Sequence, residues 1–364
     1  MKKVFVTLIL IVSISFSCND SLTDEIGPTY DRSVLLKNWY EFHIIPLHEE
    51  FKRNLTVFKN ETITFKETPN ISSLNSLRSS YLKAYTSWQS IEMFNIGKAE
   101  EIYFSSMTNI YPVNTARVES NISSDEYDLS NANNFAAQGF PAIDYLLYGT
   151  TNETKIIEKL SNDNYFNYLT NITDAIIQNT NSVLTYWETN KIDFTSSTEN
   201  TSTSSMNMMV NDFIYYYEKG FRANKVGIPG GVFSSGPLPE NVEGYFSKIH
   251  SKTFAIESLK SIIRFYNGID INGNEYAGAS LKSIIQELEN GDSENNLGKR
   301  INDKMIIANQ KLSELDESFI NQINNDNTKL LQVFDAIQEV VVLLKVDMLQ
   351  LLNINVDYVD ADGD

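Results

Sequence analysis

One acid stands inside an apolar segment of the sequence, FAAQGFPAIDYLLYG at positions 135–149, and a carboxylate in such a setting can bind a ligand or a cation. The acid is Asp144. The segment also holds Gly139 and Pro141, which helices seldom accept in their interior. In one interpretation these two residues form a helix break that turns Asp144 toward a pocket. In the other, Gly139 allows close helix packing, Pro141 occupies the first turn of a new helix, and Asp144 reaches solvent or caps a neighbour.

A second acid, Glu92, follows Trp88 and Gln89 in another apolar segment. Trp88 and Glu92 are four residues apart, so a helix would place them on one face. We expect Glu92 to meet Asp144 and Arg117 in a cavity between helices. Carboxylates with an arginine would hold a small ligand or a hard cation such as ferric iron, with Glu92 and Asp144 as its ligands. The alternative is a structural ion pair between Arg117 and either acid.

Other chemistries find little support. His43 and His48 are five residues apart and would point about 140° from each other on a helix, so they are not a zinc pair, and His250 stands alone. We expect structural roles for all three. The sequence has no Gly-x-Ser-x-Gly elbow, Walker loop or Rossmann fingerprint. The stretches at 270–274 and 360–364 resemble calcium loops but lack the full spacing that ends in a bidentate acid, so they are interpreted as a turn and a tail.

The N-terminus has the features of an export signal. A positively charged start precedes an apolar run at positions 4–16 and the single cysteine, Cys18. This pattern resembles a bacterial lipoprotein signal, in which residues 1–17 are removed and the cysteine is acylated. Residues 18–32 would then form a tether, and the acyl chains would anchor the protein to the membrane. The alternative is a plain secretory signal with an incidental cysteine.

Composition and charge narrow the function further. Of the 364 residues, 42% are hydrophobic and 21% charged, which is typical of a folded globular protein. The net charge is −18, and removal of the signal, which contains two lysines, would make the chain still more negative. Such a chain repels phosphate backbones, so nucleic acid is not an expected partner. With Cys18 acylated, no thiol would remain for a disulfide or a cysteine nucleophile.

Helical periodicity recurs along nearly the whole mature chain. The clearest apolar stripe, at steps of three and four, contains Leu330, Phe334, Ile337, Val341, Leu344, Met348 and Leu351. One helix begins near position 34 and should be kinked by Pro46. Further helices are predicted over Leu74–Phe94, Phe135–Tyr148, Tyr165–Trp187, Met206–Ala223, Val242–Tyr266, Leu281–Glu289 and Leu297–Ile323. Strand patterns are scarce, so the predicted fold class is all-α.

Two stretches break this helical series. Residues 194–207 are rich in Ser, Thr and Asn, and residues 227–244 hold many of the glycines and prolines. Helix pairs on either side of the first stretch suffice for two antiparallel bundles packed against each other. We therefore predict an N-terminal bundle over 33–200 and a C-terminal bundle over 201–364.

Several fragments, taken in order, resemble the imelysin family. The segment at 135–149 resembles the helix that carries the family's Gly-x-His-x-x-Glu motif, with Gly139, Pro141 and Asp144 at the motif positions. The other fragments are Trp88 to Glu92 for a Trp-x-x-x-Glu helix, Pro112 to Arg117 for a Pro-x-Asp-x-x-Arg loop, and 239–247 with 362–364 for the second half. Together they span most of residues 33–364.

The resemblance implies a lipid-anchored or periplasmic protein of two helical bundles, associated with bacterial iron uptake. The family was first described as insulin-cleaving metallopeptidases. Its proposed site lies where the bundles meet and includes the motif's His and Glu. On this resemblance alone, Glu243 and Ser247 are candidate site residues from the second half.

This chain departs from the motif at its most reactive position. Pro141 has no imidazole, and one carboxylate at Asp144 is a poor zinc site, since catalytic zinc usually takes three protein ligands. We therefore expect a cell-envelope lipoprotein that binds a metal, haem, a chelate or an iron-uptake partner protein, without peptidase activity. The alternatives are a metal-dependent peptidase with unusual ligands and a purely structural envelope protein.

Overall fold

The protein is described from a computed structural model, which places residues 30–289 and 296–356. Within them the chain is helical and forms no named strand; one isolated bridge joins Ile269 to Glu275. The all-α prediction is confirmed. The predicted export signal, Cys18, most of the predicted tether and the predicted acidic tail lie outside the described residues.

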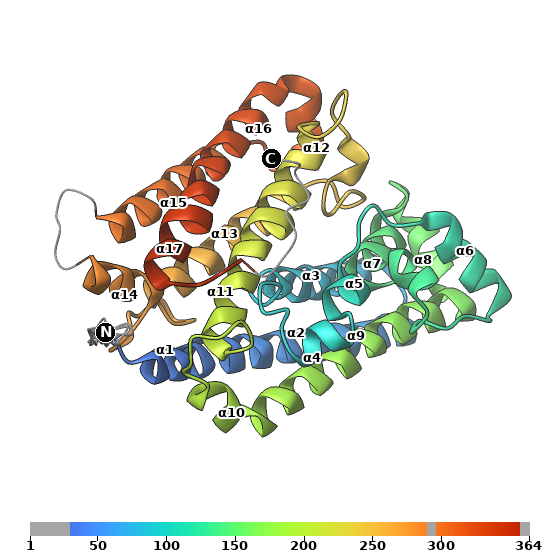
Figure 1. Ribbon diagram of the computed structural model, residues 1–364. Helices are drawn as coiled ribbons and strands as arrows, with labels where there is room; N and C mark the ends of the chain where they lie inside the picture. The colour runs from blue at the N-terminus through green and yellow to red at the C-terminus, as the bar shows by residue number, and fades with distance from the viewer. Residues whose placement is uncertain (1–29, 290–295, 357–364) are drawn as a thin grey trace, which may run out of the picture.

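The first half is built around long antiparallel helices. Its elements, with π- and 3₁₀-segments labelled η, are α1 (Arg32–Trp39), η1 (Tyr40–Ile44), α2 (Ile45–Glu67), α3 (Ile71–Trp88), α4 (Lys98–Glu101), α5 (Phe104–Thr108), α6 (Thr115–Ser124), η2 (Ala132–Ala137), α7 (Gly139–Tyr148), α8 (Glu153–Ser161), α9 (Asp163–Thr189) and α10 (Lys191–Ser196). Helix α2 packs along both α3 and α9. The short helices α6 to α8 lie at one end of this group, and α4 packs along α9 (Figure 1).

The second half follows a connection at 197–204. Its elements are α11 (Ser205–Tyr215), η3 (Tyr216–Gly227), α12 (Ile228–Gly230), η4 (Pro239–Asn241), α13 (Ser251–Asn267), α14 (Leu281–Leu288), α15 (Leu297–Ser313), α16 (Phe319–Val342), η5 (Leu343–Met348) and α17 (Leu349–Leu352). Helix α15 packs on α13 and α16, and α16 packs on η3. The predicted C-terminal stripe runs along α16, η5 and α17, and most of its side chains are buried.

The two halves share one core. The buried apolar side chains form a single cluster that runs through both. Trp39 stacks on Phe265 at 5.0 Å between ring centroids, and Tyr85 lies 4.2 Å from Phe254. In Figure 1 the blue-to-green helices and the yellow-to-red helices form two groups in contact. The division at residue 200 stays a prediction.

The first long helix contains a π-segment directly before its proline. A proline removes a backbone hydrogen bond, and its ring clashes with the carbonyl group one turn earlier. Pro46 stands in the first turn of α2, and η1 precedes it with i→i+5 winding. The wider turn makes room for the proline ring where we predicted a kink. Burial lowers the pKa of His43 in η1 to about 3 and that of His48 in α2 to about 4, so both pack as neutral rings.

Several helix predictions extended too far. The helix predicted over Leu74–Phe94 ends at Trp88, and the one predicted over Leu297–Ile323 is divided between α15 and α16. In the helix predicted over Val242–Tyr266, α13 begins only at Ser251 and the residues before it form turns. Gly244 has φ +72° and Lys248 has φ 65°, conformations that an α-helix does not contain. The loop at 242–250 is therefore free to enter the space between the two halves. Among the described helices, none combines the length and the apolarity needed to cross a bilayer.

Candidate functional site

The site is built around the start of α7. Gly139 opens this helix with φ +72°, and an added Cβ would lie only 2.2 Å from the carbonyl oxygen of Thr108 at the end of α5. Only glycine allows this approach. Pro141 follows in the first turn, where its missing N–H has no helical partner to lose. The second of our two interpretations of Gly139 and Pro141 therefore describes the local structure.

Asp144 joins α7 to the loop of the second half. Its carboxylate accepts hydrogen bonds from the backbone N–H of Phe246 at 2.7 Å and of Ser247 at 3.2 Å, and from the hydroxyl of Tyr81 at 3.3 Å. Burial raises the pKa of Asp144 to about 6, although the hydrogen bonds from Phe246 and Ser247 oppose this shift. Asp144 therefore caps a neighbouring segment, and it also lines a pocket between the two halves.

Asp144 should make the stability depend on pH. Its folded pKa of about 6 lies above the ordinary value of 3.8, so the folded protein binds this proton more tightly than the unfolded chain. Its contribution to the free energy of unfolding is then greatest below about pH 4 and is lost as the pH rises through about 6. In denaturant titrations, we expect the free energy of unfolding of wild type, measured relative to that of Asp144→Asn, to fall as the pH rises from about 4 to about 6. A constant difference would contradict a raised pKa.

A second polar cluster lies beside this contact and also spans both halves. The ammonium of Lys225 is 2.7 Å from a carboxylate oxygen of Glu243 and 3.2 Å from one of Glu92. All three side chains are at most 10% exposed. Burial alone would lower the pKa of Lys225, but the charges of Glu243 and Glu92 raise it overall. One cation is therefore shared by two buried carboxylates.

Amide and hydroxyl groups complete this cluster. Gln89 donates to Glu243 at 2.9 Å and accepts from Lys225 at 2.7 Å. Asn109 donates to Glu243 at 2.8 Å and to Glu92 at 3.0 Å. Three hydroxyl groups add further hydrogen bonds: Tyr85 donates to Asn109, Tyr216 to Glu92 and Ser258 to Gln89. We call these eight residues the lysine network, and each charged group in it has several partners.

The π-segment η3 supplies two members of the lysine network. Tyr216 and Lys225 are nine residues apart, which would put them on opposite faces of an α-helix at about 100° per residue. The i→i+5 winding of η3 changes this register, and both side chains reach Glu92. π-helical turns are rare and are frequently found at functional sites.

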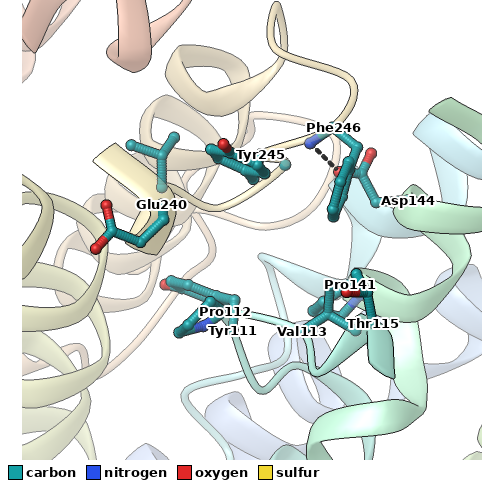
Figure 2. Close-up of a pocket in the computed structure, with 11 residues that line it drawn as sticks. Tyr111, Pro112, Val113, Thr115, Pro141, Asp144, Glu240, Tyr245 and Phe246 are labelled. Atoms are coloured by element: carbon teal, nitrogen blue, oxygen red, sulfur yellow. Dashed lines mark hydrogen bonds between the residues drawn. The ribbon is translucent and has the colours of Figure 1, made fainter. Parts of the chain in front are cut away.

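A pocket adjoins both polar clusters. Its volume is about 170 Å³, and residues from both halves line it: Tyr111, Pro112, Val113, Thr115, Pro141, Asp144, Glu240, Val242, Gly244, Tyr245 and Phe246. Figure 2 shows Tyr245 and Phe246 on one side, with Tyr111, Pro112 and Pro141 facing them. Burial raises the pKa of Tyr111 well above its ordinary value, and the charges of Glu243 and Glu92 add to the shift. Tyr111 therefore stands between the pocket and the lysine network.

The structure brings most of the predicted site residues together in two connected groups. Gln89, Glu92 and Glu243 belong to the lysine network, and Asp144 bonds to Ser247. Residues 243–247 link the two groups along the chain. Gly139 shapes the start of α7, where it packs against the backbone of α5.

Trp88 does not belong to either group. The predicted helix ends at Trp88, and residues 89–93 form turns in which the backbone N–H of Glu92 still bonds to the carbonyl oxygen of Trp88 at 3.0 Å. The indole packs against Phe51 and, edge-on at 5.1 Å, against Phe104. Trp88 is a core residue of the first half.

Arg117 is also outside the site. It lies exposed in the first turn of α6, which begins at the cap residue Asn114. Among the described residues its side chain forms no hydrogen bond or ion pair, so the structure shows neither the cavity contact nor the ion pair with Glu92 or Asp144 that we predicted. Lys225 supplies the cation that we expected from Arg117.

A metal at Glu92 and Asp144 does not fit these residues. Glu92 bonds to Asn109, Tyr216 and Lys225, whereas Asp144 bonds to Tyr81 and to the loop backbone. The ammonium of Lys225 already occupies the position between two carboxylates where a cation would bind. In the part of the chain that the structure describes, no group of three or more His, Cys, Asp or Glu side chains could hold a metal ion.

Lys225, Asn109 and Tyr216 were missed from the sequence. Lys225 stands in the segment ANKVGIPGG as one charge followed by apolar residues and glycines, and this isolation was a usable signal. Asn109 directly precedes the loop that resembles a family motif. No sequence pattern indicated the π-winding that directs Tyr216.

Comparison with known proteins agrees with this architecture. The family model described as Imelysin matches residues 44–346, which is most of the chain and includes both halves of the site. The chain belongs to the imelysin family. No match is found among the curated proteins.

Two solved structures of imelysin type share the fold. One is an imelysin-like protein from Psychrobacter arcticum 273-4, with 14% identity and a TM-score of 0.70, covering 92% of this chain and all of that one. The other is a proposed iron-regulated protein A precursor from Parabacteroides distasonis ATCC 8503, with 14% identity and a TM-score of 0.67, covering 89% of this chain and 96% of that one. At this identity the likeness concerns the fold.

Proposed function

We propose that this imelysin-family chain is an exported binding protein of iron acquisition, and that it is not a peptidase. The observation that carries the proposal is the pocket between the two halves, with Pro141 in its wall where the family motif has histidine. The iron-regulated name of one structural neighbour supports the biological setting.

The geometry argues against hydrolysis by a bound metal. The side chain of Pro141 has no donor atom for a metal, and the carboxylate of Asp144 already accepts hydrogen bonds from two backbone N–H groups. Both acids of the lysine network are already paired with Lys225. A metal-dependent peptidase with unusual ligands, the alternative, would need these contacts to break before a metal could bind.

The pocket limits what can be bound. Pockets that enclose drug-sized ligands have volumes of about 300–1,000 Å³. A pocket of about 170 Å³ suits a smaller ligand, or one group of a larger one. Haem or an iron chelate would therefore enter only in part, and a partner protein would insert a single side chain.

The proposed location is the cell envelope. The export signal and acylation of Cys18 would tether the protein to the membrane, most simply as an outer-membrane lipoprotein facing the periplasm or the exterior. Envelope proteins of iron uptake are then the expected partners.

The experiment is growth of a deletion strain at limiting iron, complemented by variants of the full chain. Thr115 is a half-buried wall residue of the pocket, and Thr115→Tyr should fill it. Exposed Thr154 provides the control, Thr154→Tyr. We expect wild type and Thr154→Tyr to restore growth, and Thr115→Tyr to fail although it is folded and expressed.

A peptidase assay separates the alternatives. We expect the purified chain to leave unfolded casein intact with and without zinc. Cleavage that a chelator abolishes and zinc restores would establish the peptidase instead. A purely structural envelope protein would show no growth defect on deletion and no change in expression on iron starvation.

A further inference from the structure

We propose that the pocket recognises an organic cation, an alkylammonium or quaternary ammonium group carried by a small ligand or a side chain. This inference rests on the proposed function, because it names the chemistry of the ligand that the same pocket takes. Three observations carry it: the charge of the lining residues, the arrangement of the aromatic rings, and the state of the nearby carboxylates.

The pocket lining is acidic and contains no basic side chain. Asp144 and Glu240 are its only charged residues among the described lining. Glu240 is exposed and lies in η4, beside the pocket (Figure 2). Lys225 does not line the pocket and is buried in its own ion pairs. In a chain of net charge −18, such a pocket attracts cations and repels anions.

Aromatic rings form the walls. Tyr245 and Phe246 stand nearly perpendicular, at 86°, with ring centroids 5.1 Å apart, and Tyr111 faces them from the first half. A positive group over the face of an aromatic ring is attracted by the ring quadrupole, and cages of several rings bind quaternary ammonium groups. Pro112, Pro141 and Val242 complete an apolar surface for the methyl or methylene groups of such a ligand.

The carboxylates favour an organic cation over a metal ion. A hard metal ion needs several oxygen atoms as direct ligands. The oxygens of Asp144 already accept three hydrogen bonds, from Phe246, Ser247 and Tyr81. An alkylammonium group needs no coordination shell; it needs apolar contact and negative potential nearby. The pocket supplies both, and its volume of about 170 Å³ accommodates a group of that size.

The test is calorimetric titration of the full chain with choline and with its neutral isostere, 3,3-dimethylbutan-1-ol. We expect saturable binding of choline and binding of the isostere weaker by about tenfold. Tyr245→Leu, which keeps an apolar side chain without the ring, should weaken choline binding by about fivefold to tenfold. Glu240→Gln should weaken it by about twofold to fivefold, and less at high salt. Glu314→Gln, an exposed acid in the same half, should change nothing.

The outcomes are distinct. Equal binding of choline and the isostere would overturn the inference, and so would the absence of choline binding to folded protein. If choline fails but Thr115→Tyr still abolishes growth at limiting iron, the proposed function stands and this inference falls. If Thr115→Tyr supports growth, the proposed use of the pocket falls whatever it binds. A tripeptide Gly-Lys-Gly distinguishes the sources: binding tighter than that of choline indicates a partner's lysine, and weaker binding a free ammonium compound.

Discussion

Replacing Lys225 by Met is expected to lower the free energy of unfolding by about 3–5 kcal/mol. The methionine fills a similar volume but leaves Glu92 and Glu243 buried without their cation. Removing one partner of a buried ion pair costs this much because an uncompensated charge stays out of water. Denaturant titration at pH 7 measures the change.

Two further variants separate the charge effect from other causes. Lys299 and Asp303 form an ion pair whose side chains are 63% and 46% exposed, so Lys299→Met should cost less than about 1 kcal/mol. Adding Glu92→Gln and Glu243→Gln to Lys225→Met removes the unpaired charges and should recover part of the loss. A Lys225→Met variant that loses no more stability than Lys299→Met would show that the lysine network is not held by its charges.

Gly139→Ala should destabilise the protein by about 3–5 kcal/mol. The left-handed backbone alone costs an L-residue roughly 1–2 kcal/mol, and the new methyl group would also collide with the carbonyl of Thr108 at 2.2 Å. Relief requires α7 to move away from α5, and Asp144 would move with it. The unfolding free energy and the binding titration should therefore both change.

Two other glycines serve as controls. Gly273 has φ +86°, and no atom lies within 4 Å of the place that an added methyl group would take, so Gly273→Ala should show the backbone cost alone, roughly 1–2 kcal/mol. Gly236 has open space and no positive φ, so Gly236→Ala should stay within about 0.5 kcal/mol of wild type. If Gly139→Ala costs no more than Gly273→Ala, the contact with α5 is not tight.

Periodicity predicted the helices well, because an apolar stripe depends only on local spacing. The stripe from Leu330 to Leu351 and the helix within 163–189 are found where expected. It failed at Val242–Ile249, which forms a loop whose Phe246 packs against Tyr145 of the other half. Glycine at position 244 was the local sign of that loop, and its positive φ shows why the helix could not start earlier.

The site could be predicted only in part, for a different reason. Asp144, Gln89, Glu92 and Glu243 were found by resemblance and by their acidic or amide character amid apolar residues. Which cation these acids meet depends on three-dimensional packing. Arg117 is nearer than Lys225 in sequence to Glu92 and Asp144, but it lies on the surface. The π-winding of η3 instead brings Lys225 inside. A local pattern contains no information on such a distant pairing.

The lysine network also has a consequence for how the molecule unfolds. Its carboxylates and amides come from both sides of the connection at 197–204, so neither half can bury its share of the charge alone. A fragment ending near residue 200 would leave Glu92 without its cation, and the remaining fragment would leave Lys225 with one acid. The two bundles should therefore melt in a single cooperative transition. We expect neither bundle to fold alone, because the charge balance of the lysine network is divided between them.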